Sequence, residues 1–165
     1  MIYLIQYKIV MGSDHVGYKM KNELRDLLET MGHIVEDVGC FNESRAEYPI
    51  YGRKAAEKVA TGQADRAVLV CGTGFGISLA ANSVHGVRCV NCIDAYTASL
   101  SRMHNNANAI AFGARVIAPE MAKMLLETWM HTEFEGGRHA DRIEMIQEMC
   151  AFPRPGEYTA KVDAS

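Results

Sequence analysis

A glycine-rich segment, Cys71-Gly-Thr-Gly-Phe-Gly76, carries the residue types with the clearest chemical potential. Glycines let a backbone turn tightly and bring several N–H groups to one point, and at a helix N-terminus such donors favour an anion or an oxyanion. A helix N-terminus also stabilises a thiolate, so Cys71 could act as a nucleophile or a base. The alternatives are a plain strand-to-helix turn and a cysteine that serves only as a small buried residue.

Polar side chains also flank other apolar segments that we expect to be strands. Asp14 and His15 follow the first of these segments, and Arg115 follows the last. Further candidates are Asp94, His104, Asn105 and Asn106. Because ligands bind beyond the carboxyl ends of the strands in a doubly wound sheet, we expect these side chains to converge with the glycine-rich segment on one rim. The alternatives are helix capping for Asp14 and a surface or capping position for His104.

Two arginines, Arg138 and Arg142, stand four residues apart in the segment Glu135-Gly-Gly-Arg-His-Ala-Asp-Arg142. At this spacing they share one face at the start of a helix, where two guanidinium groups form a clamp for a phosphate or carboxylate. The alternative is a solvated face on which the arginines pair with Glu135 and Asp141.

Other binding motifs are disfavoured by their spacing. The pattern G-x-G-x-G in mid-chain argues against a G-x-G-x-x-G dinucleotide loop, and no G-x-x-x-x-G-K-[ST] nucleotide loop occurs. Cys89 and Cys92 have the spacing of a zinc or redox pair, but in an apolar strand they point to opposite faces, and no second pair of ligands follows. We therefore expect both to be buried in the core.

The elements that must position these residues alternate between strand and helix. The expected strands are Tyr3–Met11, His33–Val38, Arg66–Cys71, Val87–Ile93 and Ala109–Phe112. The expected helices are Lys19–Met31, Tyr51–Thr61, Gly76–Ser83, Ala95–Met103, Pro119–His131 and Ala140–Cys150. Repeated strand–helix units with short links imply an α/β fold, in which helices cover both faces of a mainly parallel, five-stranded sheet.

Length and composition restrict the number of domains, the classes of partner and the compartment. The chain has 165 residues, 48% of them apolar, which suits one domain over residues 1–150, followed by a Pro- and Gly-containing tail over 151–165. The net charge of −3 argues against nucleic-acid binding by the whole surface. Glycines and polar residues make Ala67–Val87 a poor membrane span. With five scattered cysteines and no secretory signal pattern, we expect a cytoplasmic protein.

Several segments in order resemble the ribose/galactose phosphate isomerase family, which includes ribose-5-phosphate isomerases of the B type. These are GSDHVGYKMK, YPIYG, CGTGFGISLAAN, HNNANAIAFGARV and EGGRHADR, within Lys8 to Glu148. The resemblance implies a three-layer α/β/α Rossmann-like domain that forms a homodimer or a dimer of dimers, with active sites at the dimer interface. It implies reversible isomerisation of ribose 5-phosphate and ribulose 5-phosphate through a cis-enediol, with no metal or nucleotide cofactor.

The resemblance also implies roles, position by position. Cys71 matches the base that transfers a proton between carbons 1 and 2, Thr73 an assistant in ring opening or proton relay, and His104 the ring-opening acid. The backbone of Gly72, Gly74, Phe75 and Gly76 matches the anion hole for the enediolate. The positions that match substrate and phosphate binding are Asp14, His15, Asn105, Arg115, Arg138 and Arg142.

Three other functions remain open at this point. Allose 6-phosphate, galactose 6-phosphate or erythrulose 4-phosphate would use much the same residues, since pocket depth sets substrate length. A non-catalytic sugar-phosphate sensor would keep the glycine-rich loop and the arginines but would not need Cys71 and His104 together. A cysteine phosphatase would need a C-x5-R loop, and Arg88 lies far beyond that spacing from Cys71.

Overall fold

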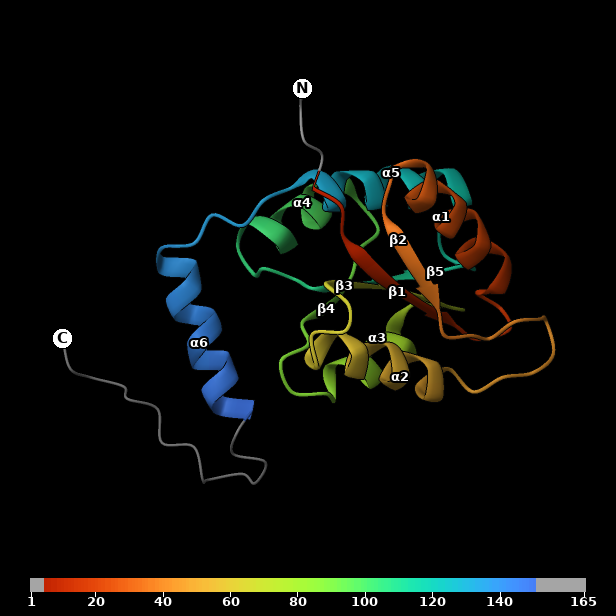
Figure 1. Cartoon of the computed structure of the whole chain (residues 1–165), viewed down its shortest axis with the longest axis horizontal. Helices are drawn as coiled ribbons and strands as arrows, with labels where there is room; N and C mark the ends of the chain where they lie inside the picture. The colour runs from red at the N-terminus through yellow and green to blue at the C-terminus, as the bar shows by residue number, and fades with distance from the viewer. Residues whose placement is uncertain (1–4, 151–165) are drawn as a thin grey trace.

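The computed structural model describes residues 5–150, in which strands and helices alternate (Figure 1). The strands are β1 (Lys8–Ser13), β2 (Ile34–Asp37), β3 (Arg66–Cys71), β4 (Cys89–Asn91) and β5 (Ala109–Gly113). The helices are α1 (Tyr18–Thr30), α2 (Tyr48–Ala60), α3 (Phe75–Asn82), α4 (Ala95–Met103), α5 (Pro119–His131) and α6 (Arg138–Cys150). The tail over 151–165 lies outside the described residues.

All five strands are parallel and lie in the order β2-β1-β3-β5-β4. After β1 the chain moves outward to β2, and it then returns to place β3 on the other side of β1. The point where the strand order reverses is therefore between β1 and β3, and their carboxyl ends are the place where open α/β sheets bind ligands.

Helices cover both faces of the sheet, which confirms the expected three-layer α/β/α fold (Figure 1). Because alternate residues of a strand point to opposite faces, β3 supplies Val68 and Val70 to a core under α1, α4 and α5. The same strand supplies Leu69 and Cys71 to a second core under α2 and α3. Every residue of β3 is buried, as its continuous apolar sequence predicts.

Several element boundaries differ from those expected. Strand β1 begins at Lys8 rather than Tyr3, and β4 keeps only three residues of the expected Val87–Ile93. Strand β4 is short because it is an edge strand, and the preceding Arg88 donates its backbone N–H to the Asn108 side chain at 2.7 Å. Helix α2 begins three residues early, at Tyr48, with proline in its first turn.

Within residues 5–150 all five cysteines are free thiols. Cys89 and Cys92 are buried in different cores, on opposite faces, as predicted. Helix α6 projects away from the three layers (Figure 1). Across residues 5–150, no helix is both long and apolar enough to cross a membrane.

Candidate functional site

A pocket of about 330 Å³ opens at the carboxyl ends of β1 and β3. Its size falls at the lower end of the range for small-molecule sites. Seven of its lining residues are predicted site residues: Asp14, His15, Cys71, Gly72, Thr73, Gly76 and Arg115. The structure therefore brings together the parts of the predicted site that follow β1, β3 and β5.

Cys71 ends β3 beneath this pocket with its side chain almost fully buried. The backbone N–H of Gly74 donates to Cys71 Sγ at 3.1 Å, and such a bond strengthens when the sulfur is a thiolate. Gly74 makes this contact from a left-handed conformation, φ +82°, at the N-cap of α3. The glycine is needed there because that conformation is costly for residues with a side chain.

The loop that follows Cys71 is tied to its neighbours by side chains and backbone. Thr73 Oγ1 accepts the N–H of Phe75 at 3.3 Å, and Asn91 Nδ2 donates to Thr73 O at 3.1 Å. A Cβ on Gly76 would lie 2.5 Å from the ring of Tyr48, so a side chain there would displace the tyrosine from the pocket wall. The loop is therefore fixed with its N–H groups at the N-terminus of α3, where they favour negative charge.

Asp14 and His15 reach the pocket from the turn between β1 and α1. The N–H of Gly17 donates to Asp14 Oδ1 at 2.9 Å, which fixes a carboxylate that is almost fully buried. His15 Nδ1 lies 3.2 Å from the backbone nitrogen of Ala46 and 3.3 Å from its carbonyl oxygen. The backbone of Ala46 therefore holds the His15 ring at the pocket wall.

Arg115 adds a positive charge to the same pocket. The backbone N–H of Arg115 donates to Gly72 O at 3.0 Å. The guanidinium of Arg115 lies 3.7 Å from where a Cβ on Gly72 would be. Arg115 and the N-terminus of α3 thus supply donors for anionic oxygens on two sides of the Cys71 loop.

The expectation that His104 and Asn105 share this rim is wrong within one chain. Cys71 pairs with Gly113 at the end of β5, whereas His104 and Asn105 precede the start of that strand. The separation along β5 is about 13 Å at the usual rise per residue. Residues that precede a parallel strand lie at the opposite edge of the sheet from residues that follow it.

Arg138 and Arg142 also lie away from the pocket. They sit in the first two turns of α6, are exposed, and project with that helix from the body of the chain (Figure 1). Asp94 is likewise not a pocket residue: it caps α4, and its carboxylate accepts the N–H of Thr97 at 2.7 Å.

Three residues with a possible functional role are not among the residues predicted from the sequence. Tyr48 lines the pocket. The proline in YPIYG marks the start of α2 and could have indicated that Tyr48 begins this helix. Glu135 and His139 contact His104 at the opposite edge, with His139 stacked on the His104 ring at 4.2 Å between centroids. Their spacing gave no signal of this contact, because Glu135 lies in the loop before α6 rather than on the helix.

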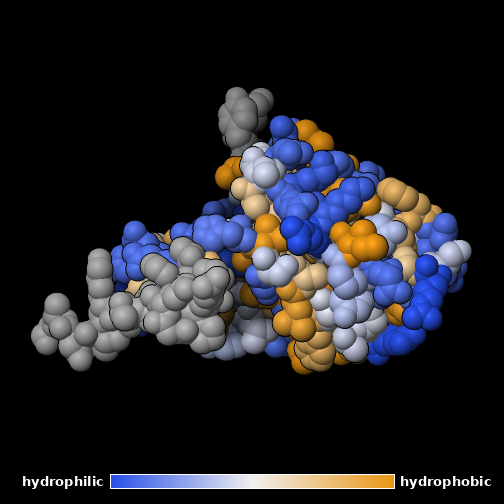
Figure 2. All heavy atoms as spheres, turned by 90° about the horizontal axis from the view of Figure 1, so that it is seen from below, coloured by the Kyte–Doolittle hydropathy of each residue, from blue (hydrophilic) through white to orange (hydrophobic). Residues whose placement is uncertain are grey.

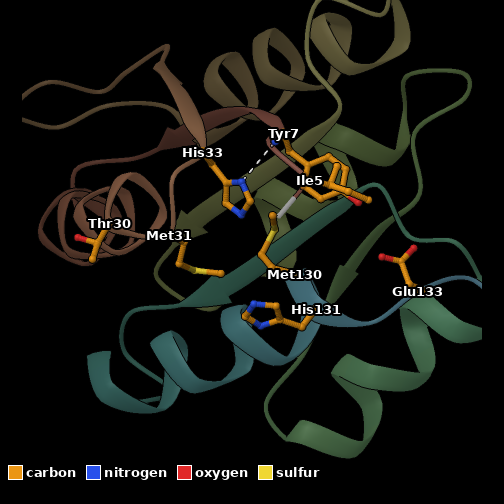
Figure 3. A pocket seen from close by; sticks show the side chains of 8 residues that line it. All are labelled: Ile5, Tyr7, Thr30, Met31, His33, Met130, His131 and Glu133. Atoms are coloured by element: carbon orange, nitrogen blue, oxygen red, sulfur yellow. Dashed lines mark hydrogen bonds between the residues drawn. The ribbon is translucent and has the colours of Figure 1, made fainter. Parts of the chain in front are cut away.

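A second pocket, of about 320 Å³, lies between the start of β1 and the end of α5 (Figure 3). Its wall is formed by Ile5, Tyr7, Thr30, Met31, His33, Met130, His131 and Glu133. The N–H of Tyr7 donates to His33 Nδ1 at 3.3 Å across this pocket (Figure 3). It shares no lining residue with the Cys71 pocket.

Comparison with known proteins places the chain among sugar-phosphate isomerases. The sequence model of the ribose/galactose isomerase family matches residues 9–146. The chain is 46% identical to ribose-5-phosphate isomerase B of Escherichia coli, over 84% of this chain and 93% of that protein. It is 40% identical to D-erythrulose-4-phosphate isomerase 2 of Mycolicibacterium smegmatis, over 88% of this chain and 96% of that one.

The structural comparison agrees with the sequence comparison. The fold superposes on ribose-5-phosphate isomerase B of Clostridium thermocellum with a TM-score of 0.85 and 46% identity, over 86% of this chain and 96% of that one. A family match over most of the chain, joined to a shared fold at this identity, leaves one conclusion. The chain belongs to the ribose/galactose isomerase family.

Proposed function

We propose that this protein is an aldose–ketose isomerase that interconverts ribose 5-phosphate and ribulose 5-phosphate. The observation that carries the proposal is the buried Cys71 sulfur, which accepts the N–H of Gly74 inside a pocket with Asp14, His15 and Arg115. The relatives from Escherichia coli and Clostridium thermocellum, both named ribose-5-phosphate isomerase B, support this substrate.

The chemistry requires a base beside a carbonyl and donors aimed at the developing oxyanion. In the open-chain aldose, the Cys71 thiolate removes the proton from carbon 2, and the electron pair moves toward the carbonyl oxygen to give a cis-enediolate. The N–H groups of the loop from Gly72 to Gly76 stabilise that oxygen. A proton then moves from the carbon-2 hydroxyl to the oxygen on carbon 1, and the Cys71 thiol returns its own proton to carbon 1. The oxygen on carbon 2 becomes the carbonyl of the ketose, with no net gain or loss of atoms or electrons.

A single chain lacks two parts of this scheme at the pocket: the ring-opening acid and the phosphate clamp. We assign these parts to a second copy of the chain, whose His104, Asn105, Arg138 and Arg142 would reach the pocket across a dimer interface. The position of α6, held out from the body, suits such an exchange (Figure 1). The assembly is then a homodimer or a dimer of dimers.

Exposed apolar side chains support an interface of this kind. Phe75 and Leu79 on α3 are 65% and 71% exposed, and Ile93 and Tyr96 at the start of α4 are 60% and 73% exposed. Apolar patches are visible on the face that carries α2 and α3 (Figure 2). Large apolar side chains exposed this close to a site are typical of interaction surfaces.

A second candidate substrate is erythrulose 4-phosphate, which the name of the Mycolicibacterium smegmatis relative favours. The same Cys71 chemistry would serve a four-carbon sugar, because the reacting carbons and the phosphate are common to both. Free thiols throughout the described chain suit a reducing compartment, and we place the protein in the cytoplasm.

A substrate panel tests this proposal. Purified protein in EDTA is assayed, with coupled detection of product, against ribose 5-phosphate, allose 6-phosphate, galactose 6-phosphate and erythrulose 4-phosphate. Fastest turnover of ribose 5-phosphate is the expected result. Preference for another sugar would keep the mechanism and change the substrate, and binding without turnover of any sugar would indicate the sensor instead.

A further inference from the structure

Three side chains that lie outside the Cys71 pocket of their own chain form a compact group, and the proposed mechanism gives a role to only one of them, His104. His104, Glu135 and His139, called here the two-histidine cluster, meet where α4 ends and α6 begins. One ligand atom from each residue lies within 4.8 Å of the other two. Glu135 Oε2 lies 3.8 Å from His104 Nε2 and 3.5 Å from His139 Nε2.

Backbone hydrogen bonds hold the two-histidine cluster in place. The N–H of His104 donates to Leu100 O at 2.9 Å, which closes the last turn of α4. The N–H of Glu135 donates to Met103 O at 3.1 Å, which fixes the segment before α6 against the end of α4. The two imidazole rings stack in near-parallel planes, 8° apart.

One atom of the two-histidine cluster is left unsatisfied. His139 is only 6% exposed, and its Nε2 is fully buried with no hydrogen-bond partner within residues 5–150. Buried polar atoms are almost always hydrogen-bonded, so an exception in a native structure requires an explanation. The Glu135 carboxylate lies 3.5 Å from this nitrogen, too far for a good hydrogen bond, and a cation between the two groups would satisfy both.

We propose that the two-histidine cluster binds a divalent transition-metal ion such as Zn²⁺, through one ring nitrogen of each histidine and the Glu135 carboxylate. Imidazole and carboxylate are the ligands that zinc takes in His₂Glu sites, with water in the fourth position. The side chains of His104 and Glu135 are 35% and 46% exposed, which leaves a side open for that water.

The observed distances are close to those a metal requires. Ligand atoms at about 2.1 Å from a tetrahedral ion are about 3.4 Å apart, against the 3.5 and 3.8 Å seen here. Stacked rings cannot both direct a lone pair at one ion, so one ring must turn about its Cβ–Cγ bond. His104 is the ring with room to turn, and this torsion is soft in histidine.

Metal binding at this position has a functional consequence that rests on the proposed function. His104 is the proposed ring-opening acid, and a ring nitrogen that ligates a metal cannot exchange a proton with the sugar. The site would therefore act as a reversible, inhibitory metal site, released by chelators.

The first experiment is calorimetric titration of the EDTA-stripped, dialysed full-length protein with Zn²⁺. The expected result is one ion per chain, with affinity reduced at least about tenfold in His139→Gln and in Glu135→Gln. Glu135 is half-exposed, so its variant keeps the test valid if the buried His139→Gln fails to fold. Cys71→Ser tests for a thiolate ligand, from the same chain or from the second copy whose Cys71 the proposed dimer brings toward His104, and should bind Zn²⁺ as the parent protein does.

The second readout is the absorption spectrum of the Co²⁺-substituted protein, which is independent of activity. Nitrogen and oxygen ligands give d–d bands without the thiolate-to-metal charge-transfer band that a cysteine ligand would add. Parent-like Zn²⁺ affinity in both His139→Gln and Glu135→Gln, loss of binding in Cys71→Ser, or no binding at all would overturn the proposal. Inhibition of turnover by Zn²⁺, relative to each variant's own metal-free rate, is measured separately, so failure of the isomerase assignment leaves the binding test intact.

Discussion

Cys71 is the residue on which the proposed chemistry depends, because its sulfur lies against the Gly74 N–H at the carboxyl end of β3. Cys71→Ser replaces a thiol by a much weaker acid in a similar volume. We expect steady-state kinetics to show kcat lowered at least about 100-fold, with KM changed much less, since the base acts in the transition state.

Cys40→Ser is the matched control for this substitution. Cys40 is buried too, but its sulfur contacts Ser13 Oγ and Asn42 O rather than the pocket. Near-normal turnover in Cys40→Ser is the expected result. Turnover by Cys71→Ser close to that of the Cys40 variant would remove Cys71 from the mechanism.

Gly17 is the residue that allows α1 to approach β3 closely. A Cβ at this position would lie 2.4 Å from Val70 O, one residue before Cys71. We expect Gly17→Ala to lower the free energy of unfolding by about 1–3 kcal/mol, as overpacking does, measured by urea denaturation. In Gly72→Ala the atom nearest to the new Cβ would be 3.7 Å away, so that variant should keep the parental free energy of unfolding. An equal loss of unfolding free energy in both variants would refute the steric explanation.

At the scale of elements, a buried ion pair joins α1 to the end of β2. Lys21 Nζ is fully buried and donates to Asp37 Oδ1 and to Cys40 O, both at 2.6 Å. Lys21→Met leaves the mostly buried Asp37 carboxylate unpaired, and we expect a loss of about 3 kcal/mol in the free energy of unfolding.

The exposed pair between Lys19 on α1 and Glu43 in the loop after β2 provides the comparison. Its side chains are 74% and 58% exposed, so Lys19→Met should cost less than about 1 kcal/mol in the same urea denaturation. If both methionine variants lose the same free energy of unfolding, burial of the Lys21 ammonium does not explain how much the Lys21–Asp37 pair contributes to stability.

A pH effect is expected where β2 begins. Burial, and then the positive charges of Arg66 and His131, lower the pKa of His33, whose neutral Nδ1 accepts the N–H of Tyr7. The unfolded chain therefore binds more protons than the folded chain as the pH falls below about 6.5, so stability declines on acidification.

Urea denaturation at pH 7.5 and pH 5.5 measures this effect. We expect His33→Gln to lose less stability between these two pH values than the parent protein does. His85→Gln, which changes an exposed histidine in the loop after α3, should keep the parental loss. A parental pH dependence in His33→Gln would contradict the assignment.

The elements also show what a single sequence can predict. The continuous apolar run of β3 and the glycines after it fix a buried strand, a tight turn and a helix N-terminus, and all three are present. The order of the strands cannot be predicted from such local patterns, because pairing between β1 and β3 joins residues more than fifty positions apart. The short β4 follows from its place at the sheet edge, which only the strand order reveals.

At the scale of the whole molecule, the predicted site divides into two halves. Residues that follow strands gather in the Cys71 pocket, whereas His104 precedes β5 and belongs to the opposite edge. The prediction grouped residues by their closeness to a strand, without separating those that precede a strand from those that follow it. His104 was therefore placed at the wrong edge of the sheet. Arg138 and Arg142 lie on the projecting α6, away from the Cys71 pocket of their own chain, which is why the proposed site draws on a second copy (Figure 1).

The direct test of a shared site is complementation between two inactive chains. Cys71→Ser and His104→Asn are co-expressed with different tags, and the mixed dimer is purified and assayed with ribose 5-phosphate. One of its two sites then combines an intact Cys71 with an intact His104, so we predict about half the turnover of the parent dimer, while each variant alone stays inactive. Turnover of the mixed dimer no higher than that of the separate variants would contradict a site built from two copies of this chain.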